Sequence, residues 1–234
     1  MIKPWMFGTH GNLPSTTNLV GYWPFNETSG TNAPDESGNG NDGTLVNMED
    51  ADWVDGVVGK CLDFGGTDEY VSISNDAALN FTGEDFSLSL WVQLSTKLQN
   101  SGILIKGDIP DDDAVNYGID QTAAGWNFLV SDSSGVSSHT TKINSLVGYD
   151  VGVWRHIAAT YEHSTTTMKL YVDGILVESG DTLNAPVTAN TGSLRIASYA
   201  NLIFTDGKID EVRIYSTALT ASEIKALYDY PAGV

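Results

Sequence analysis

The chain has a single cysteine among its 234 residues, Cys61, so no intrachain disulfide is possible and a disulfide-stapled scaffold is excluded. No apolar run approaches the ~20 residues that a membrane-spanning helix needs. The first 18 residues contain one lysine and no apolar h-region, so they do not have the pattern of a secretory signal. The sequence therefore predicts no membrane insertion, and it predicts no signal peptide in this stretch.

Positive charge is also scarce, with 11 Lys and Arg residues against 30 Asp and Glu residues and a net charge of −19. A surface this acidic repels phosphate groups and anionic lipids, which excludes nucleic acid as an expected partner. The same balance is compatible with neutral ligands, with cations, or simply with solubility in salty water. Hydrophobic residues still make up 41% of the chain, enough for a sizeable core.

From Leu19 onward, short runs alternate apolar and polar residues and are separated by Gly, Asn and Asp, a pattern typical of half-buried strands. The run FSLSLWVQL places four apolar side chains on one face: Phe86, Leu88, Leu90 and Val92. KLYVDGILVES predicts a hairpin, because Asp173 and Gly174 tolerate positive φ in a two-residue turn. Residues 1–18 lack this periodicity, so we expect an irregular leader followed by one β-domain over residues 19–234.

One segment, TASEIKALYDY, predicts a helix near the C-terminus. Thr220 is the expected N-cap, and Glu223 follows at the capping-box spacing. Ile224 and Leu227 belong to its apolar stripe, and Pro231 ends the pattern. Many short strands with a single C-terminal helix predict an all-β sandwich.

Six runs follow one another between residues 19 and 230: LVGYWPFNETSGTNAPDESGNGNDGTL, GKCLDFGGTDEYVSI, DFSLSLWVQL, WRHIAATYE, KLYVDGILV and GKIDEVRIYSTALTASEIKALY. In this order they resemble the laminin-G-like jelly-roll domains of the concanavalin A-like lectin/glucanase superfamily. The resemblance implies a jelly-roll sandwich of two antiparallel sheets. It also implies a sugar-binding or adhesion role and, as in many such domains, one calcium ion. The fold alone does not determine the function.

Glucanases of this superfamily carry their catalytic carboxylates on one strand as Glu-x-Asp-x-x-Glu, which places them on one face about 5 Å apart. The acidic runs EDAD at 49–52 and KIDEVR at 208–213 do not have this spacing. The four histidines show no HxxxH spacing, and the nucleophile motif GxSxG is absent. We therefore expect a protein that is not an enzyme.

The run DESGNGNDG has oxygen-bearing side chains at the spacing of the first half of a calcium loop. Asp35, Ser37 and Asn39 occupy positions 1, 3 and 5, and Gly40 follows for the sharp turn. Val46 stands where an EF-hand carries its last acidic ligand, so the loop is not an EF-hand. A second carboxylate must come from elsewhere in the chain.

The resemblance supplies this carboxylate as Asp210 in the IDEVRIY block, since the first and last strands of such domains are neighbours. The predicted structural calcium site contains Glu27, Asp35, Asn39, Asn41 and Asp210. The alternative is that Asp35 to Gly43 forms Asx-turns and that Asp210 caps a buried backbone group.

Aromatic residues in polar or glycine-rich surroundings are candidates for sugar binding, because the apolar face of a pyranose stacks on an exposed ring. Neighbouring amides and carboxylates then bind the hydroxyl groups. The predicted ligand site contains Tyr117, Gln121, Trp126, Asn127, Tyr149, Tyr199 and Asn201. For each aromatic residue the alternative is a partly buried packing role. For His156, on an alternating strand, we expect a hydrogen-bonded core position.

Together these observations predict a non-catalytic, calcium-stabilised, lectin-like module that binds a glycan or polysaccharide. The resemblance implies an extracellular or surface-displayed position, at a cell or particle surface. The alternative is an adhesion module that binds a protein partner, or a structural spacer or shell component without glycan binding.

Overall fold

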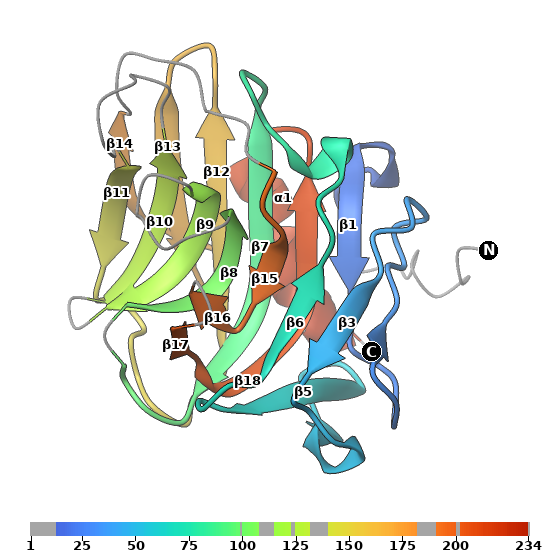
Figure 1. The fold of residues 1–234 in the computed structure, drawn as a ribbon. Coiled ribbons are helices and arrows are strands. Elements are labelled where there is room, and N and C mark those ends of the chain that lie inside the picture. The colour runs from blue at the N-terminus through green and yellow to red at the C-terminus, as the bar shows by residue number, and fades with distance from the viewer. Residues whose placement is uncertain are drawn as a thin grey trace.

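The computed structural model describes residues 13–98, 100–107, 115–122, 125–131, 140–181, 191–199 and 202–233. Two eight-stranded sheets pack face to face, and one short helix lies behind them (Figure 1). The predicted all-β jelly-roll sandwich with a C-terminal helix is therefore confirmed. Strand β1 begins at Leu19, where the alternation begins in the sequence. Most of the predicted leader, residues 1–12, lies outside the described residues.

Sheet A contains, in spatial order, β14 (Ile175–Asp181), β13 (Thr167–Val172), β12 (Arg155–Glu162), β7 (Phe86–Leu94), β18 (Asp206–Tyr215), β5 (Lys60–Gly65) and β4 (Trp53–Asp55), with β1 (Leu19–Trp23) also paired to β18. Sheet B contains β11 (Thr140–Ser145), β10 (Gly125–Ser131), β9 (Val115–Thr122), β8 (Ser101–Gly107), β15 (Leu194–Ile196), β6 (Tyr70–Ile73), β3 (Gly43–Val46) and β2 (Asn32–Ala33). A separate two-stranded ribbon is formed by β16 (Ser198–Tyr199) and β17 (Ile203–Phe204). Short 3-10 turns are Thr16–Asn18, Asp50–Asp52, Ala77–Leu79 and Tyr230–Gly233.

The core lies between the two sheets and follows the alternation read from the sequence. The predicted inward face of β7 is fully buried in it: Phe86, Leu88, Leu90 and Val92. Phe86 stacks on Phe81 with ring centroids 4.8 Å apart, and Tyr117 and Phe128 of sheet B close around the same ring. Successive side chains of a strand point to opposite faces, so each sheet gives one set of side chains to this core.

The predicted hairpin joins β13 to β14. Asp173 and Gly174 have φ values of 52° and 75°, the left-handed region that a two-residue turn of this kind requires. The Asp173 carboxylate accepts hydrogen bonds from His156 N at 3.0 Å and from Arg155 Nη1 at 2.6 Å. The turn is therefore fixed to the neighbouring strand β12 as well as by its own geometry.

Helix α1 (Ala221–Asp229) covers the outer face of sheet A, behind the sheets in Figure 1. Its predicted capping box is present, because Glu223 N donates to Thr220 Oγ1 and Thr220 N donates to Glu223 Oε2. Ile224 and Leu227 are buried against apolar side chains of sheet A: Leu19, Tyr22, Ala158, Tyr171 and Tyr215. In the described part of the chain, no helix has the length and apolar character to cross a membrane.

The outer face of sheet B carries the β16–β17 ribbon, which lies in front of β8 in Figure 1. Tyr199 of this ribbon packs on a small apolar cluster that belongs to this outer face, not to the central core: Ile105, Val115 and Leu129. Sheet A is thus covered by a helix and sheet B by a short ribbon. The two outer faces consequently differ in what they show to solvent.

Candidate functional site

The loop that begins at Asp35 is organised around the carboxylate of that residue. Asp35 Oδ1 accepts hydrogen bonds from Tyr22 N and Ser37 N, and Oδ2 accepts one from Asn41 N, each at 2.9 Å. The bond from Ser37 is an Asx-turn, as the alternative interpretation predicts. The Asp35 carboxylate thus compensates three backbone donors that would otherwise lie unpaired near the core.

The amide side chains of the same loop bond to strand β1. Asn39 Nδ2 donates to Leu19 O, and Asn41 Nδ2 donates to Val20 O, both at 2.9 Å. Since Tyr22 N also bonds to Asp35, the loop occupies the edge of β1 that faces away from β18. Strand β1 therefore separates Asp35, Asn39 and Asn41 from Asp210. The structure does not bring the five predicted calcium ligands together.

Asp210 lies in β18 against a different loop, residues 55–60. Its Oδ2 accepts hydrogen bonds from Val57 N at 2.7 Å and Val58 N at 3.1 Å. Its Oδ1 is buried and has no hydrogen-bond partner. Burial, and then the neighbouring Glu211 carboxylate, raise the pKa of Asp210 to about 8. A buried carboxylate with one unsatisfied oxygen is costly, and a bound cation would compensate that cost.

Two further residues approach this loop from the end of β1. Asn26 Oδ1 accepts a hydrogen bond from Lys60 N at 2.9 Å, and a Cβ on Gly59 would lie 2.1 Å from the same oxygen. Glu27 is the next residue in the chain. Among the described residues, no group of three or more His, Cys, Asp or Glu side chains could hold a metal ion. A cation at Asp210 would therefore need amide and carbonyl oxygens among its ligands.

A buried ion pair adjoins Asp210 on the same strand, and the sequence analysis did not identify it. Glu211 has a φ of 56° at the irregularity where β18 pairs with β7, and its carboxylate accepts hydrogen bonds from Tyr22 and Arg213. The Arg213 guanidinium lies over the ring of Tyr22, 4.2 Å from its centroid, and also faces Tyr230. Ile209 and Val212 both face the core, so the irregularity turns Glu211 to the outer face of sheet A, whereas strict alternation from Ile209 would have pointed it inward.

Four of the predicted ligand residues have side chains that face the interior. They are Tyr117, Gln121, Trp126 and Tyr149. The hydroxyl of Tyr117 donates to Leu79 O at 3.1 Å, and its side chain has no solvent exposure. All four side chains are buried in this structure, which does not present them to a ligand at the surface. Each occupies the inward position of its strand or loop, and the packing alternative holds for the aromatic residues.

Three of these four nevertheless lie together, at one end of the space between the sheets. The ring of Tyr149 meets Trp126 edge to face, with centroids 5.3 Å apart, and its hydroxyl donates to Gln121 Oε1 at 3.2 Å. Gln121 Nε2 donates in turn to Ser101 Oγ at 2.6 Å. Tyr149 and Gln121 thus satisfy buried polar atoms of the cluster, whereas Trp126 Nε1 is buried without a hydrogen-bond partner. Lys97 Nζ lies 4.7 Å from the centroid of the Tyr149 ring.

Asn127 points the other way, onto the outer face of sheet B. Its Nδ2 donates to Asp120 Oδ1 at 2.5 Å, and its Oδ1 accepts from Asn144 Nδ2 at 2.7 Å. The three residues face one another across β9, β10 and β11. Asn144 is partly exposed, while Asp120 and Asn127 are buried. Tyr199 lies on the same outer face, and Asn201 lies outside the described residues.

Two outward aromatic residues were missed by the sequence analysis. Tyr70 on β6 and Phe204 on β17 are both partly exposed, with ring centroids 6.1 Å apart and planes inclined by 37°. For Tyr70, the run EYVSI contains the alternation that could have revealed its outward position. Because Val71 and Ile73 are buried, the alternation directs Tyr70 to the outer face.

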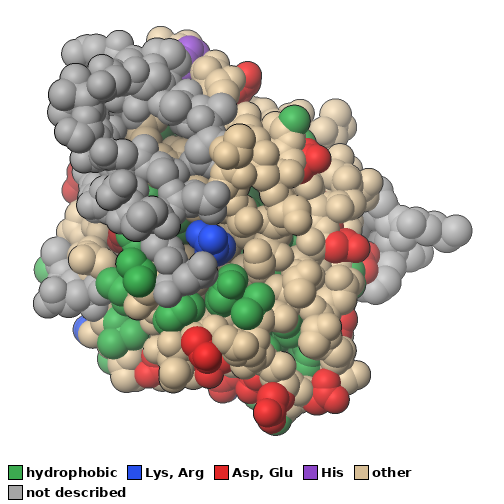
Figure 2. Space-filling model, in the orientation of Figure 1, with side chains coloured by type: hydrophobic (Ala, Val, Ile, Leu, Met, Phe, Trp, Pro, Cys, Tyr) green, Lys and Arg blue, Asp and Glu red, His purple; other side chains and the backbone are tan. Residues whose placement is uncertain are grey.

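A row of polar side chains crosses the outer face beside these rings. Thr44 pairs with Ser72, Ser72 with Arg195 and Arg195 with Ile105, so these residues stand opposite one another on β3, β6, β15 and β8. In the space-filling view a small patch of Lys or Arg atoms lies near β8, beside β15, and hydrophobic atoms lie below it (Figure 2). Hydroxyl, guanidinium and aromatic groups therefore share this face.

His156 makes a contact with a serine that resembles a catalytic pair, but it is closed to any substrate. Its Nε2 lies 2.9 Å from Ser89 Oγ, and the imidazole is only 1% exposed. Trp91 and Tyr228 cover it, with ring centroids 5.3 and 6.1 Å from that of the imidazole. Burial, with a smaller effect of Arg213, lowers the pKa of His156 to about 3. The expected hydrogen-bonded core position of His156 is confirmed.

The comparisons with known proteins agree with this architecture. The profile of the concanavalin A-like lectin/glucanases superfamily, Laminin_G_3, matches residues 64–225. No curated protein sequence matches the chain. The binding domain of Paraclostridial Mosquitocidal Protein 1 is similar in structure, with a TM-score of 0.70 and 17% identity over 92% of this chain and 52% of that one.

Two enzymes contain similar domains. Domain 4 of AbnA, an extracellular GH43 arabinanase from Geobacillus stearothermophilus solved with arabinotriose, has a TM-score of 0.69 and 22% identity over 90% of this chain and 98% of that domain. Trypanosoma rangeli sialidase has a TM-score of 0.67 and 18% identity over 92% of this chain and 33% of that one. The chain thus spans about half of the mosquitocidal binding domain and a third of the sialidase.

At these identities the similar structures show a shared fold, and the profile match covers most of the chain. The two antiparallel sheets packed face to face agree with both findings. The chain belongs to the concanavalin A-like lectin/glucanases superfamily.

Proposed function

We propose that this protein is a non-catalytic carbohydrate-binding module displayed at a cell or particle surface. The observation that carries the proposal is the outer face of sheet B, where partly exposed rings adjoin hydroxyl, amide and guanidinium groups. A sugar offers an apolar ring face together with many hydroxyl groups, and such a surface complements both. Membership of a lectin and glucanase superfamily supports the same function.

The proposal of a module without catalysis takes into account the two carboxylates of the KIDEVR run, which are buried. Asp210 and Glu211 are buried in β18, and Glu211 is held by Arg213 and Tyr22. Neither carboxylate faces the outer surface of sheet B. A retaining or inverting glycosidase needs two carboxylates on either side of an accessible glycosidic bond.

The test is a panel of glycans and soluble polysaccharides measured for retention and for chain cleavage. We expect at least one polysaccharide to slow the protein in affinity electrophoresis, with no new reducing ends after prolonged incubation. New reducing ends would contradict the non-catalytic proposal. Absence of retention across the whole panel would contradict carbohydrate binding.

A protein-binding adhesion role is the second candidate, because one end of the sandwich exposes apolar side chains. Leu146 and Ile175 are 66% and 65% exposed, and Val147 and Leu176 are also exposed. Arg155 holds their two loops together by ion pairs with Asp150 and Asp173. Beads coated with the protein should lose adhesion to cells in a Leu146→Ser/Ile175→Ser variant if this end binds a protein partner.

The proposal includes a structural calcium ion bound at Asp210. The unpartnered Asp210 Oδ1, which is fully buried, supports this position, and Glu27 and Asn26 are the nearby residues that would add oxygen ligands. When bound, the ion would supply positive charge to a carboxylate that is otherwise buried with one free oxygen. The loop of Asp35, Asn39 and Asn41 would then stabilise β1 without contacting the ion.

Thermal unfolding measured with EDTA and with added calcium tests whether Asp210 binds the ion and the loop of Asp35 does not. Calcium should raise the midpoint by several degrees through preferential binding to the folded state, and Asp210→Asn should abolish that rise. Asp35→Asn is the matched control: it should lower the midpoint equally with and without calcium, because it weakens hydrogen bonds only. An unchanged midpoint for the wild type, or a calcium response lost in Asp35→Asn and kept in Asp210→Asn, would contradict the Asp210 site.

A further inference from the structure

We infer that the β16–β17 ribbon and Tyr70 form a stacking platform for neutral saccharide chains, with Phe204 and Tyr70 as the two contact rings. The inference rests on the proposed function and adds a location and a ligand class to it. No anionic polysaccharide, and no protein, is the expected occupant.

The ribbon is held firmly on β8. A Cβ on Gly102 would lie 2.6 Å from Ser198 O, so the close approach of the two backbones requires glycine at this position. Thr205 Oγ1 donates to Gly102 O at 2.9 Å, and Ala197 N donates to Ile103 O at 3.0 Å. These contacts fix both ends of the ribbon to the strand beneath it.

Backbone strain marks the point where the chain enters the ribbon. Ala197 is fully buried and has a φ of 69°, a conformation that costs of order 1 kcal/mol for a residue with a Cβ. Thr205 N donates to Ala197 O at 2.9 Å, which closes the base of the ribbon. Such strain persists only where the surrounding contacts impose it, and here it turns the chain out over the face of sheet B.

The ribbon exposes apolar side chains to solvent. Leu202 is 70% exposed, and Ile203 and Phe204 are partly exposed. The Phe204 ring pairs with Tyr70 of β6, so two aromatic rings from separate strands lie side by side. Rings fixed by a rigid base lose little conformational entropy on binding, which favours their use as contact surfaces.

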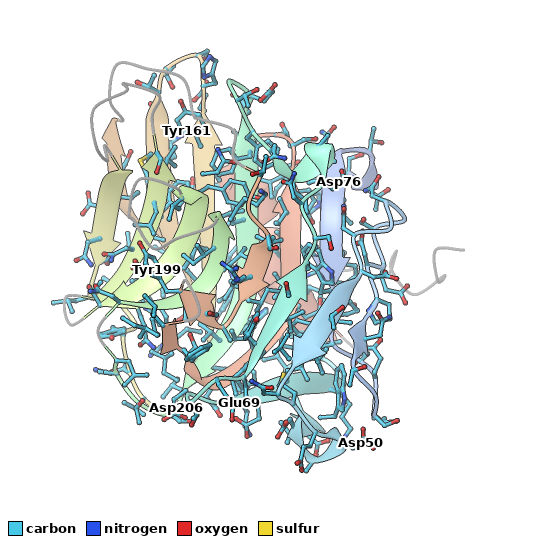
Figure 3. All side chains as sticks on the ribbon, viewed as in Figure 1. Asp50, Glu69, Asp76, Tyr161, Tyr199 and Asp206 are labelled. Carbon is cyan, nitrogen blue, oxygen red and sulfur yellow. The ribbon has the colours of Figure 1, made fainter. Side chains whose placement is uncertain are left out.

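Two acidic residues adjoin the ring pair in the chain and disfavour anionic ligands, while the Arg195 guanidinium on the same face donates to Gly107 O at 3.3 Å. Glu69 precedes Tyr70, and Asp206 follows Phe204 by two residues; both lie at the lower end of the molecule in Figure 3. They flank the same residue, since Asp206 pairs with Gly65 and a Cβ on Gly65 would lie 3.0 Å from Glu69 Oε1. Two carboxylates beside the rings repel sulfated or carboxylated sugars and accept hydrogen bonds from hydroxyl groups.

The Glu69 carboxylate is also held in its ionised form. Its Oε2 accepts hydrogen bonds from Thr67 N at 3.0 Å and from Asp68 N at 3.1 Å. Partial burial raises the pKa of Glu69, but the backbone donors outweigh burial and leave the pKa below its usual range. Repulsion of an anionic chain would therefore persist at any pH at which sugar binding is normally measured.

Hydroxyl groups continue the surface away from the rings. Tyr70 and Ser72 share the outer face of β6, and Thr44 stands opposite Ser72 on β3. A chain stacked on Tyr70 would thus meet hydroxyl donors and acceptors along the next two strands. A protein partner is less well matched, because a stable protein interface needs about 800 Å² per side and an apolar centre free of charge.

The experiment is calorimetric titration of the whole protein with arabinan and mannan as neutral chains and with polygalacturonate and chondroitin sulfate as anionic chains. We expect a neutral chain to bind, and we expect Phe204→Ala and Tyr70→Ala each to weaken it by at least about fivefold. Phe204→Tyr should retain binding. Tyr228→Ala, at a partly exposed aromatic residue of helix α1 behind the opposite sheet, is the matched control and should leave the Kd unchanged.

A separate variant tests the role of the two carboxylates. Glu69→Gln/Asp206→Asn should increase binding of the anionic chains and leave that of the neutral chain within about twofold. Wild-type binding that is unchanged by both ring variants, or that favours an anionic chain, would overturn the platform and leave the carbohydrate-binding function in place. If none of the four chains binds and no glycan of the panel retains the protein, both proposals are overturned.

Discussion

The outer faces of the two sheets use the same kinds of residue in opposite ways. On sheet A, helix α1 covers Trp91 and His156, and Tyr228 stacks on Trp91 with centroids 5.6 Å apart. On sheet B, the rings of Tyr70 and Phe204 pair at a similar distance but remain partly exposed. Aromatic content alone therefore does not distinguish a packing surface from a binding surface.

The difference lies in what covers each face. Helix α1 buries Ile224 and Leu227 and excludes water from the residues beneath, so the contacts on that face stabilise the fold. The ribbon on sheet B exposes Leu202 and Phe204 and buries little. Changes on the first face should alter unfolding and leave binding intact, whereas changes on the second should do the reverse. The following predictions are ordered by their effect on the free energy of unfolding.

Ile224→Ala should have the largest effect. Ile224 is fully buried between α1 and sheet A, so its truncation should lower the free energy of unfolding by about 2–5 kcal/mol through lost burial and a residual cavity. Urea denaturation followed by tryptophan fluorescence measures this change. The Kd for a neutral polysaccharide should stay the same, and a parallel loss of both properties would abolish the distinction between the two faces.

His156 should make stability fall in acid. Its pKa is about 3 when folded and ordinarily near 6.5, so the unfolded state binds the extra proton between these values. Its contribution is therefore fully present above pH 6.5 and is lost as pH falls, by about 1.4 kcal/mol per pH unit. Arg213 on β18 and Tyr228 on α1 are the titratable groups that face it.

The measurement is the free energy of unfolding of the wild type and His156→Gln between pH 7 and pH 5. Glutamine keeps a hydrogen-bonding group near Ser89 and does not titrate. The difference between the two proteins should shrink as the pH falls. A difference that stays constant over this range would mean that His156 is not held neutral by burial.

Thr220→Ala should lower stability by about 1 kcal/mol, because it removes the side-chain cap of α1 and leaves Glu223 N without its acceptor. Hydrogen exchange should rise first at the N-terminal turn of the helix. Thr220→Ser is the control and should retain most of the protection. Protection equal to that of the wild type in Thr220→Ala would show that packing alone holds the helix.

Phe204→Ala should have the smallest effect on unfolding, below about 1 kcal/mol, since its ring is only partly buried. The same variant should show the largest loss of saccharide affinity. Unfolding and titration on one sample separate the two effects. A large loss of stability would place Phe204 among the packing residues and make the second face resemble the first.

Local structure was predictable from the sequence wherever a short residue pattern is compatible with only one conformation. The inward set Phe86 to Val92, the Asp173-Gly174 turn and the Thr220 capping box are confirmed. Each depends on residues within one strand, turn or helix end. The ligand site was less predictable, because alternation tells which residues share a face but does not tell which face is the interior.

Trp126 and Asn127 illustrate this limit. They are adjacent, both predicted for the ligand site, and they point to opposite sides of β10. Tyr70 and Phe204 lie far apart in the sequence and meet only through the packing of the ribbon on sheet B. No pattern within either segment contains that contact.

By itself the sequence determined the β-sandwich class, the acidic surface, the strand alternation and the capped helix, because these follow from composition and from contacts between near neighbours. Only the tertiary structure decided that β1 stands between Asp35 and Asp210, and that the partly exposed rings of Tyr70 and Phe204 meet. The physical reason is that strand order and the covering of each sheet arise from contacts between distant segments. Those contacts decide which carboxylate keeps a free oxygen and which ring faces solvent.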